Sequence, residues 1–468
     1  MKLSGTADLR QGSAGPLTPA GATAAVLGAG RSGLAAASLL LRQGYRVNLT
    51  ELKDNERIRA EVATLIARGA QVKLGGHDPK LLAGSDFIII SPGIDERMEV
   101  LQGRELKGIP LYSEVELAYW FCPLPLVAVS GTNGKTTTVS LIGAMLEAAG
   151  IKARVAGNIG LPLCRAVAEL TDETLLVVEI SSFQLHTIKS FRPRLGVLLN
   201  LSPDHLERYD SVDAYYAAKM RLFENMDERD LAILNAGDTK LAALAGPHVH
   251  CPVIWFGLEK RAETFAFVED GEIRLRSSRA GGIERVIGLD KIRLRGSHNL
   301  ENILAAGTAA AACGAPAEAL ARAVRSFEGL PNRLEPVGHV DGVLYVNDSK
   351  ATTVESVLRA LESFSEPLVL IMGGRHKGSS YAPLEGEIRR IVRLIIALGE
   401  AAGIIAADLG PFCRVEKVSS LEEAVGLARE TARPGETVLL SPGCSSFDMF
   451  RDYEQRGETF REIVRRLK

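Results

Sequence analysis

The sequence predicts an α/β protein of three domains: a Rossmann-like N-terminal domain, a central P-loop ATPase-type domain and a C-terminal Rossmann-like domain. Three observations support this prediction. Two strand-to-helix junctions are rich in glycine, ATAAVLGAGRSG at 22–33 and LVAVSGTNGKTT at 126–137. The last third of the chain holds four apolar runs, each followed by glycine or polar residues. The length of 468 residues suits about three domains of ordinary size.

The first domain is expected over 21–121, after a flexible tail at 1–20 that is rich in glycine, alanine and proline. Its glycines occupy the three fixed positions of G-x-G-x-x-G: Gly28, Gly30 and Gly33. A second apolar run ends at Glu51, where an acidic side chain can hold a ribose hydroxyl. A third run, at 86–94, ends in a Pro-Gly turn. The pattern indicates a nucleotide-binding fold but does not say which nucleotide it binds.

The second domain is expected over 122–330 and opens with a candidate phosphate loop, GTNGKTT. Backbone N–H groups in such a loop, and the positive end of the helix after it, attract phosphate oxygens. Lys135 adds a charge for a β- or γ-phosphate, and the Thr136 hydroxyl can ligate Mg²⁺. The usual spacing has a glycine where Val129 stands, so this is a variant loop. The alternative is an ordinary strand-to-helix turn that contains glycine.

Polar residues interrupt or follow the apolar runs of this second domain. Glu179 lies within the run at 174–181, and His205 follows the run at 194–202 beside Asp204. A buried carboxylate without a partner is costly, which favours a metal-ligand role for Glu179 over a structural hydrogen bond. For His205, a structural and a functional role remain equally open.

The third domain is expected over 331–468 as a second doubly wound α/β domain. Its strand-like runs lie at 342–349, 367–374, 393–399 and 437–443. Because the carboxyl ends of parallel strands meet at one edge of a sheet, the polar loops that follow these runs should lie together there.

Composition excludes several classes of protein. The net charge of −2 gives no general attraction to nucleic acid or to an anionic membrane. No apolar run reaches the ~20 residues that a membrane span needs, and the N-terminus shows no signal-peptide pattern. The six cysteines form no C-x-x-C pair, which suggests neither zinc nor a disulfide framework. A cytoplasmic protein is expected.

The motifs together resemble those of the Mur ligases of peptidoglycan synthesis, along nearly the whole chain. The matching stretches, in order, are GTNGKTT (131–137), GNIG (157–160), EISSFQL (179–185), SPDHLERY (202–209), AAKMRLFEN (217–225), SHNLENILAA (297–306), PNRLE (331–335), NDSKAT (347–352), GGRHKG (373–378) and SPGCSSFDMFRDYEQRG (441–457). Their common order makes a chance match implausible.

Within that family, the resemblance implies a ligase that adds D-glutamate to UDP-N-acetylmuramoyl-L-alanine, an early step of peptidoglycan precursor synthesis. ATP would activate the substrate carboxylate as an acyl phosphate, which the amine of D-glutamate then attacks. The implied partners are UDP-N-acetylmuramoyl-L-alanine, D-glutamate and ATP, with Mg²⁺ at two sites and no nucleic acid or membrane insertion. A monomer is expected.

The resemblance also assigns roles to residues. The catalytic group would be Lys135, Glu179, His205 and Lys219. ATP would bind Gly131, Thr132, Asn133, Gly134, Lys135, Thr136, Thr137, Asn299, Asn302, Arg333 and Asp348. The UDP-linked substrate would bind Arg31, Ser32, Glu51, Gly93, Asn158 and His205. D-Glutamate would bind Lys350, Thr352, Lys377, Ser446 and Tyr453. The metal ligands would be Thr136, Glu179, His205 and Lys219.

An ammonium group has no lone pair for Mg²⁺, so the resemblance implies that Lys219 carries a carbamate formed from CO₂. Without the resemblance, a solvated helix lysine would be the simpler interpretation of Lys219. The sequence departs from the family pattern at five positions: Glu51, Thr353, Arg375, His376 and Tyr453. These departures leave the expected reaction class unchanged but concern the uracil and D-glutamate ends of the site.

Three alternatives remain. Another ligase of the superfamily would add a different amino acid, or a glutamyl unit to folate. A dehydrogenase with two cofactors would turn over NADH, and a non-enzymatic nucleotide-binding scaffold would show no ATPase activity that depends on acceptor substrates.

Overall fold

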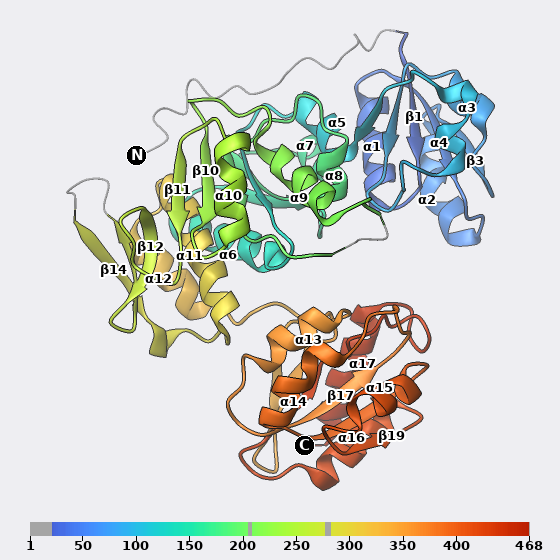
Figure 1. The fold of residues 1–468 in the computed structure, drawn as a ribbon. Coiled ribbons are helices and arrows are strands. Elements are labelled where there is room, and N and C mark those ends of the chain that lie inside the picture. Colours follow the sequence, from blue (N-terminus) through green and yellow to red (C-terminus); the bar gives the residue numbers. More distant parts are fainter. Residues whose placement is uncertain (1–20, 205–207, 277–281, 468) are drawn as a thin grey trace. The chain divides into compact units, whose positions relative to one another are not determined.

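The computed structural model describes residues 21–204, 208–276 and 282–467. The expected tail at 1–20 and the predicted site residue His205 lie outside these ranges. The described residues form three β-sheets whose strands are connected largely by helices, which confirms the predicted α/β fold class (Figure 1). By its contacts the chain divides into two compact units: one joins the chain up to Lys291 with Glu301–Arg325, and the other joins Ile292–Leu300 with Ser326–Lys468.

The first sheet has five parallel strands in the order β3-β2-β1-β4-β5. Its strands are β1 (Thr23–Leu27), β2 (Arg46–Glu51), β3 (Gln71–Leu74), β4 (Phe87–Ile90) and β5 (Leu111–Ser113). Its helices are α1 (Arg31–Arg42), α2 (Glu56–Ala67), α3 (Pro79–Ala83), α4 (Glu99–Gln102) and α5 (Glu114–Trp120). Gly33 lies against the turn before α1, since a Cβ there would come 1.9 Å from the Gly28 carbonyl oxygen.

The second sheet has nine strands in the order β14-β13-β12-β11-β10-β9-β6-β8-β7. Its strands are β6 (Leu126–Ser130), β7 (Ala153–Gly157), β8 (Leu175–Glu179), β9 (Leu195–Leu198), β10 (Leu231–Asn235), β11 (Val253–Phe256), β12 (Thr264–Glu269), β13 (Glu272–Arg276) and β14 (Ile283–Gly288). Its helices are α6 (Lys135–Ala148), α7 (Leu163–Ala168), α8 (Ser182–His186), α9 (Val212–Met220), α10 (Thr239–His248), α11 (Ser297–Ala312) and α12 (Ala317–Ser326). Strands β12 to β14 are antiparallel, whereas β6 to β11 pair in parallel.

Within the first unit, the buried carboxylate of Glu116 on α5 ties the first sheet's last helix to the second sheet. Its oxygens accept hydrogen bonds from the backbone N–H groups of Lys189, Ser190 and Phe191, at 2.8–3.0 Å. The Trp120 indole and the Ser190 hydroxyl donate to the same carboxylate. Hydrogen bonds to a charged group are the stronger ones, so this contact fixes the segment before β9 against α5.

The third sheet has six strands in the order β15-β16-β20-β17-β18-β19, of which only the β15–β16 pair is antiparallel among the described residues. Its strands are β15 (Glu335–Val340), β16 (Val343–Asn347), β17 (Leu368–Gly373), β18 (Val392–Leu398), β19 (Val415–Lys417) and β20 (Thr437–Leu440). Its helices are α13 (Val354–Leu361), α14 (Glu385–Ile391), α15 (Ala402–Leu409), α16 (Leu421–Thr431) and α17 (Tyr453–Arg466). The loops after β16, β17 and β20, which are neighbours in the sheet, carry all the residues predicted to bind D-glutamate except Tyr453, the first residue of α17.

Candidate active site

The phosphate loop runs from β6 into α6, as the sequence predicted. Gly131 and Gly134 both have positive φ, +150° and +85°, and Gly134 is the residue that precedes the helix. Asn200, after β9, holds the loop from outside: its side chain accepts from the Asn133 N–H and donates to the Asn133 carbonyl. The Thr132 hydroxyl donates to the Ser202 carbonyl and accepts from the Tyr215 hydroxyl. The loop is therefore held in shape by the segment after β9 and by α9 (Val212–Met220).

Two lysines meet at the carbonyl oxygen of Gly131. The Lys135 ammonium donates to the carbonyls of Gly131 and Thr132, both at 2.8 Å. The Lys219 side chain, on α9, reaches the Gly131 carbonyl at 2.8 Å and lies 4.7 Å from the centre of the Tyr215 ring. Lys219 is only 1% exposed, so the interpretation as a solvated helix lysine is wrong.

Burial is the main cause that lowers the pKa of Lys219 well below its usual value. The charge of Lys135 lowers this pKa further, while Asp204 raises it. A buried amine beside a second cation favours its neutral form. The neutral amine, unlike the ammonium, has a lone pair that can react with an electrophile.

Glu179 ends β8, the strand next to β6, and is 3% exposed. Its Oε1 accepts from the Asn158 side-chain amide at 3.1 Å, and the Asn158 N–H bonds to the Glu179 carbonyl at 2.9 Å. Its buried Oε2 has no hydrogen-bond partner among the described residues. The structural hydrogen bond thus accounts for one carboxylate oxygen and leaves the other available for a further ligand.

A Mg²⁺ ion fits this donor set, because a buried carboxylate oxygen without a partner and a hydroxyl in the first turn of α6 are both oxygen ligands. The hydroxyl belongs to Thr136, which is 7% exposed, and Thr137 beside it in the helix is 5% exposed. No group of three or more His, Cys, Asp or Glu side chains suited to a metal occurs in the described part of the chain. The predicted ligand His205 lies outside that part.

Asn302 of α11 packs against the start of α6. Its Oδ1 accepts from the Thr138 hydroxyl at 3.3 Å. A Cβ on Gly134 would lie 2.2 Å from the same oxygen, so the glycine is required by contact as well as by its positive φ. Asn299, three residues earlier on α11, donates to the Arg295 carbonyl at 2.7 Å.

Four of the residues predicted to bind the UDP-linked substrate, Arg31, Ser32, Glu51 and Gly93, lie at the carboxyl ends of β1, β2 and β4, whereas Asn158 follows β7 in the second sheet. Glu51 accepts from the Ala29 N–H at 2.7 Å and from the Lys53 N–H at 2.9 Å, so its carboxylate braces the glycine turn. Arg31 and Ser32 form the first turn of α1, and Gly93 is exposed in the loop after β4. The Arg208 guanidinium donates to the Ile94 carbonyl of that loop at 2.7 Å.

The residues predicted to bind D-glutamate converge in the second unit. Lys377 donates to the Thr352 hydroxyl at 3.3 Å, and the Lys350 ammonium lies 5.0 Å from the centre of the Tyr453 ring. Ser446 is 3% exposed, and its carbonyl accepts from the N–H groups of Met449 and Phe450. The arrangement places two cations and two hydroxyl groups on neighbouring loops.

Asp348 and Arg333 belong to the loops at the β16 end of this sheet. The Asp348 carboxyl accepts from the Ser441 hydroxyl at 2.9 Å and from the Leu334 N–H at 3.3 Å. Burial raises the pKa of Asp348 to about 7, against the lowering effects of these hydrogen bonds and of two arginines. Asp348 therefore fixes the position of the segment that carries Arg333.

The structure explains three of the departures from the family pattern. Thr353 is the N-cap of α13, where its hydroxyl accepts from the Ser356 N–H. Arg375 forms a two-point ion pair with Glu400 at 3.0 and 3.1 Å. His376 accepts from the Gly378 N–H and bonds to the Ser379 carbonyl, which shapes the loop around Lys377.

Sequence reasoning missed two buried residues in the second unit. Asn332 has a φ of +63°, a conformation that asparagine tolerates better than most residues, and its side chain accepts from Asn347 and Arg461. Arg456, on α17, bonds to three of the site loops. A signal was present in the sequence, since Gly457 stands inside a helix, and a Cβ there would lie 1.7 Å from the Asn332 Oδ1.

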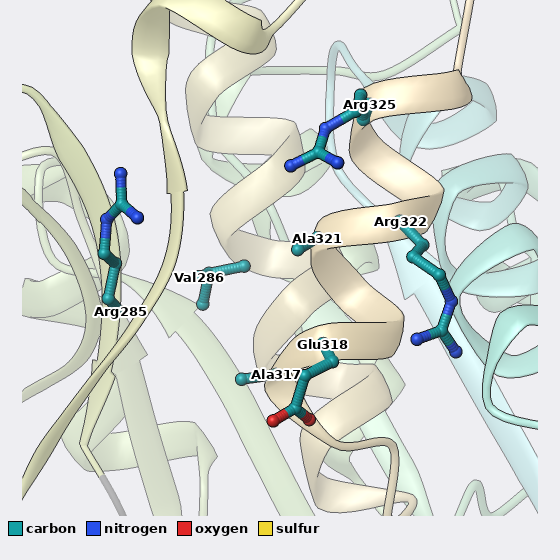
Figure 2. Close-up of a pocket in the computed structure, with 7 residues that line it drawn as sticks. All are labelled: Arg285, Val286, Ala317, Glu318, Ala321, Arg322 and Arg325. Carbon is teal, nitrogen blue, oxygen red and sulfur yellow. The ribbon is translucent and has the colours of Figure 1, made fainter.

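A separate hollow of about 280 Å³ lies between β14 and α12 in the first unit (Figure 2). Val286 of β14 faces Ala317 and Ala321 of α12 across it, and Arg325 points into it. Arg322 points away, toward α6, and donates to the Ala148 carbonyl. None of the predicted site residues lines this hollow.

In the described part of the chain, no helix combines the length and the apolar character that crossing a membrane requires.

Comparison with protein families gives three matches. The profile of the Mur ligase MurD-like N-terminal domain matches residues 22–113, and that of the Mur ligase middle domain matches 129–310. The profile of the Mur ligase glutamate ligase domain matches 332–444. Together these matches extend over all three sheets.

Curated relatives match almost the full chain. A UDP-N-acetylmuramoylalanine--D-glutamate ligase from Pelotomaculum thermopropionicum is 43% identical, over 95% of this chain and 97% of the relative. One of the same name from Geobacter metallireducens is 42% identical, over 94% and 97%.

Among solved structures, UDP-N-acetylmuramate-alanine ligase MurC from Thermotoga maritima has a TM-score of 0.59 at 18% identity, over 95% of this chain and 100% of the other. MurF ligase from the same organism, solved in complex with ADP, has a TM-score of 0.58 at 17% identity, over 90% and 96%. These two similarities establish the fold. The family matches and the curated relatives show that the chain belongs to the Mur ligase family.

Proposed function

We propose that the protein is the ATP-dependent ligase that joins D-glutamate to UDP-N-acetylmuramoyl-L-alanine in the synthesis of peptidoglycan precursors, in the cytoplasm. The observation that carries the proposal is the phosphate loop with Lys135, beside a buried Glu179 whose Oε2 has no hydrogen-bond partner among the described residues. The names and the 42–43% identity of the curated relatives support the choice of substrates.

The chemistry needs an activated carboxylate, because hydroxide is a poor leaving group. An oxygen of the L-alanine carboxylate attacks the γ-phosphorus of ATP, the bond to the β-phosphate oxygen breaks, and ADP leaves. The D-glutamate amine then attacks the acyl carbon and loses a proton. The tetrahedral intermediate collapses by cleaving the carbon–oxygen bond to phosphate, which gives amide and inorganic phosphate.

The chain's own groups would position two anions that repel each other. Lys135 would bind the phosphates of ATP, together with the N–H groups of the loop and the N-terminus of α6. Asn302 and Asn299, with Arg333 and Asp348, would bind the rest of the nucleotide. Asn158, already bonded to Glu179, would orient the substrate near its reacting carboxylate.

Two Mg²⁺ ions would neutralise charge between the carboxylate and the phosphates. Thr136 and Glu179 would hold one of them, and Glu179, His205 and a carbamate on Lys219 would hold the other. The burial of Lys219 against Gly131 and its lowered pKa support the carbamate, since CO₂ reacts with a neutral amine.

The uracil and diphosphate would be held by Arg31, Ser32, Glu51 and Gly93, at the carboxyl edge of the first sheet. In the second unit, Lys350, Thr352, Lys377, Ser446 and Tyr453 would bind D-glutamate. A monomer is sufficient for this scheme, because one chain contains every residue predicted to bind the substrates and the metal ions.

The test is a coupled ADP-release assay with UDP-N-acetylmuramoyl-L-alanine, ATP and a panel of amino acids. We expect ADP release with D-glutamate and none above background with L-glutamate, L-lysine or diaminopimelate. Equal release with one of these would make the protein a different ligase. With a substrate whose carboxylate carries ¹⁸O, one label should appear in inorganic phosphate, and its absence there would contradict the acyl phosphate.

A further inference from the structure

Arg456 is a buried arginine that bonds to the segments carrying the residues predicted to bind D-glutamate. It lies on α17 and is only 3% exposed. Gly457, next to it, lets the helix approach Asn332 and Asn347 closely, since a Cβ there would come 1.7 Å from Asn332 and 3.0 Å from Asn347. The glycine in the middle of this helix therefore brings the guanidinium group against the sheet edge.

The guanidinium group bonds to three loops at once. Its Nε donates to the Ser349 hydroxyl at 3.0 Å, and one terminal nitrogen donates to the Ser349 carbonyl at 2.8 Å. The other terminal nitrogen reaches the Gly373 carbonyl at 3.3 Å, and both reach the Cys444 carbonyl at 3.3 and 3.4 Å. These three residues lie at the ends of β16, β17 and β20.

Each bonded residue is close in sequence to a residue predicted to bind D-glutamate. Ser349 precedes Lys350, Gly373 ends β17 just before the loop that carries Lys377, and Cys444 is two residues before Ser446. The Ser349 hydroxyl also donates to the Tyr453 carbonyl at 2.8 Å. One side chain thus connects every segment of the proposed amino-acid pocket.

The acceptors of all five hydrogen bonds from Arg456 are uncharged oxygens. Asp348 and Asp448 lie near enough to act on it through space, and burial lowers the pKa of Arg456 to about 10. The group remains a cation at neutral pH. A buried cation bonded to carbonyl dipoles keeps much of its field, and the field acts strongly where water is excluded.

We propose that Arg456 is a positioning residue for the amino-acid acceptor. It holds the three loops in register and adds a fixed positive charge beneath a pocket for a dicarboxylate. This inference rests on the proposed function, since it takes the acceptor to be an anionic amino acid bound by these loops. It assigns no chemical step to Arg456.

The test compares Arg456→Lys and Arg456→Gln with the same two changes at Arg465, which is exposed on the same helix. Lysine keeps the charge but has no planar fork to reach three loops, and glutamine loses the charge. We expect the KM for D-glutamate to rise about tenfold in Arg456→Lys and about a hundredfold in Arg456→Gln. The KM values for ATP and the UDP-linked substrate should stay within about twofold, and both Arg465 variants should match the wild type.

If Arg456 had a purely structural role, its variants would show lower activity or a lower melting temperature, without a selective rise in the KM for D-glutamate. An unchanged KM for D-glutamate, or an equal rise for all three substrates, would overturn the inference. If the Arg456 variants do not fold, Ser349→Ala decides, because it removes one acceptor and the link to Tyr453. We expect about a threefold rise in the KM for D-glutamate there, and no rise would overturn the inference.

The wild type is assayed first with the amino-acid panel, which separates this inference from the proposed function. If the wild type ligates a different amino acid, the proposed function fails. The KM values of the Arg456 variants are then measured for that amino acid, and the same separation between substrates is expected.

Discussion

Replacing Gly134 by alanine tests whether close contact with Asn302 shapes the nucleotide site. Gly134 has a φ of +85°, which costs an alanine about 1–2 kcal/mol. The added Cβ would also lie 2.2 Å from the Asn302 Oδ1, so the asparagine side chain must move. Moving it removes its hydrogen bond with Thr138, worth about 1 kcal/mol.

Gly150 offers a matched control at the other end of α6. Its φ is +73°, and a Cβ there would meet nothing within 4 Å. Gly150→Ala therefore has the same backbone strain without the contact. The difference in unfolding free energy between the two variants should be about 1 kcal/mol, measured by urea denaturation monitored within the first unit.

The nucleotide affinity should separate the two variants further. If Asn302 contacts ATP, displacing it loses one neutral hydrogen bond, or about 0.5–1.5 kcal/mol, which is roughly two- to tenfold in KM for ATP. Gly150→Ala should leave this KM within about twofold. Equal KM values for ATP in the two variants would refute the reasoning that Asn302 is positioned by contact with Gly134.

Three further outcomes are expected. Lys219→Ala should lose most activity, with partial recovery in acetate, because a carboxylate oxygen can take the place of the proposed carbamate. Wild-type activity in this variant would contradict the carbamate. Lys377→Ala should raise the KM for D-glutamate roughly ten- to a hundredfold, because it loses a charged hydrogen bond worth about 1.5–3 kcal/mol. An equal rise in the KM for ATP would contradict the role of Lys377 in binding D-glutamate. Burial raises the pKa of Glu114 from 4.5 to about 7. Between these two pH values the folded chain binds more protons than the unfolded chain, so the folded state loses stability as the pH rises. In Glu114→Gln, the melting temperature should fall less steeply with pH over that range than in the wild type. Equal slopes in the two proteins would contradict this prediction.

The fold was predictable where strands are buried on both faces. Strand β17 is apolar along its whole length, and β6 and β8 are apolar up to their last residues, Ser130 and Glu179, so the sequence shows each as one continuous run. The missed strands include β3, β5, β7, β14, β15 and β19, which are the six edges of the three sheets. Each of these edge strands is partly exposed, so its apolar signal is weak. The antiparallel β13 was missed because charged and apolar residues alternate along it, and β12, whose residues 265–268 are apolar, was missed as well.

The candidate site was predictable where function shows in local motifs. Lys135, Glu179 and Lys377 each follow or end a strand, so their sequence context already indicates a ligand site. Arg456 could not be found in this way, because its importance depends on carbonyl groups more than 80 residues earlier in the chain, at Ser349 and Gly373. Such a contact exists only after the sheet has formed. Domain boundaries stay a prediction, since the compact units number two rather than three.

The division of the chain between its two units bears on how the protein is made. The chain passes from one unit to the other at 291–292, at 300–301 and at 325–326, and one passage falls inside α11. On the ribosome, the first unit therefore lacks its last segment until residue 325 has emerged, by which time residues 292–300 of the second unit are already present. No single cut yields both units whole. A truncated chain that ends at 291 should bind nucleotide poorly and be prone to aggregation during synthesis, since it lacks Asn302 and the helices α11 and α12.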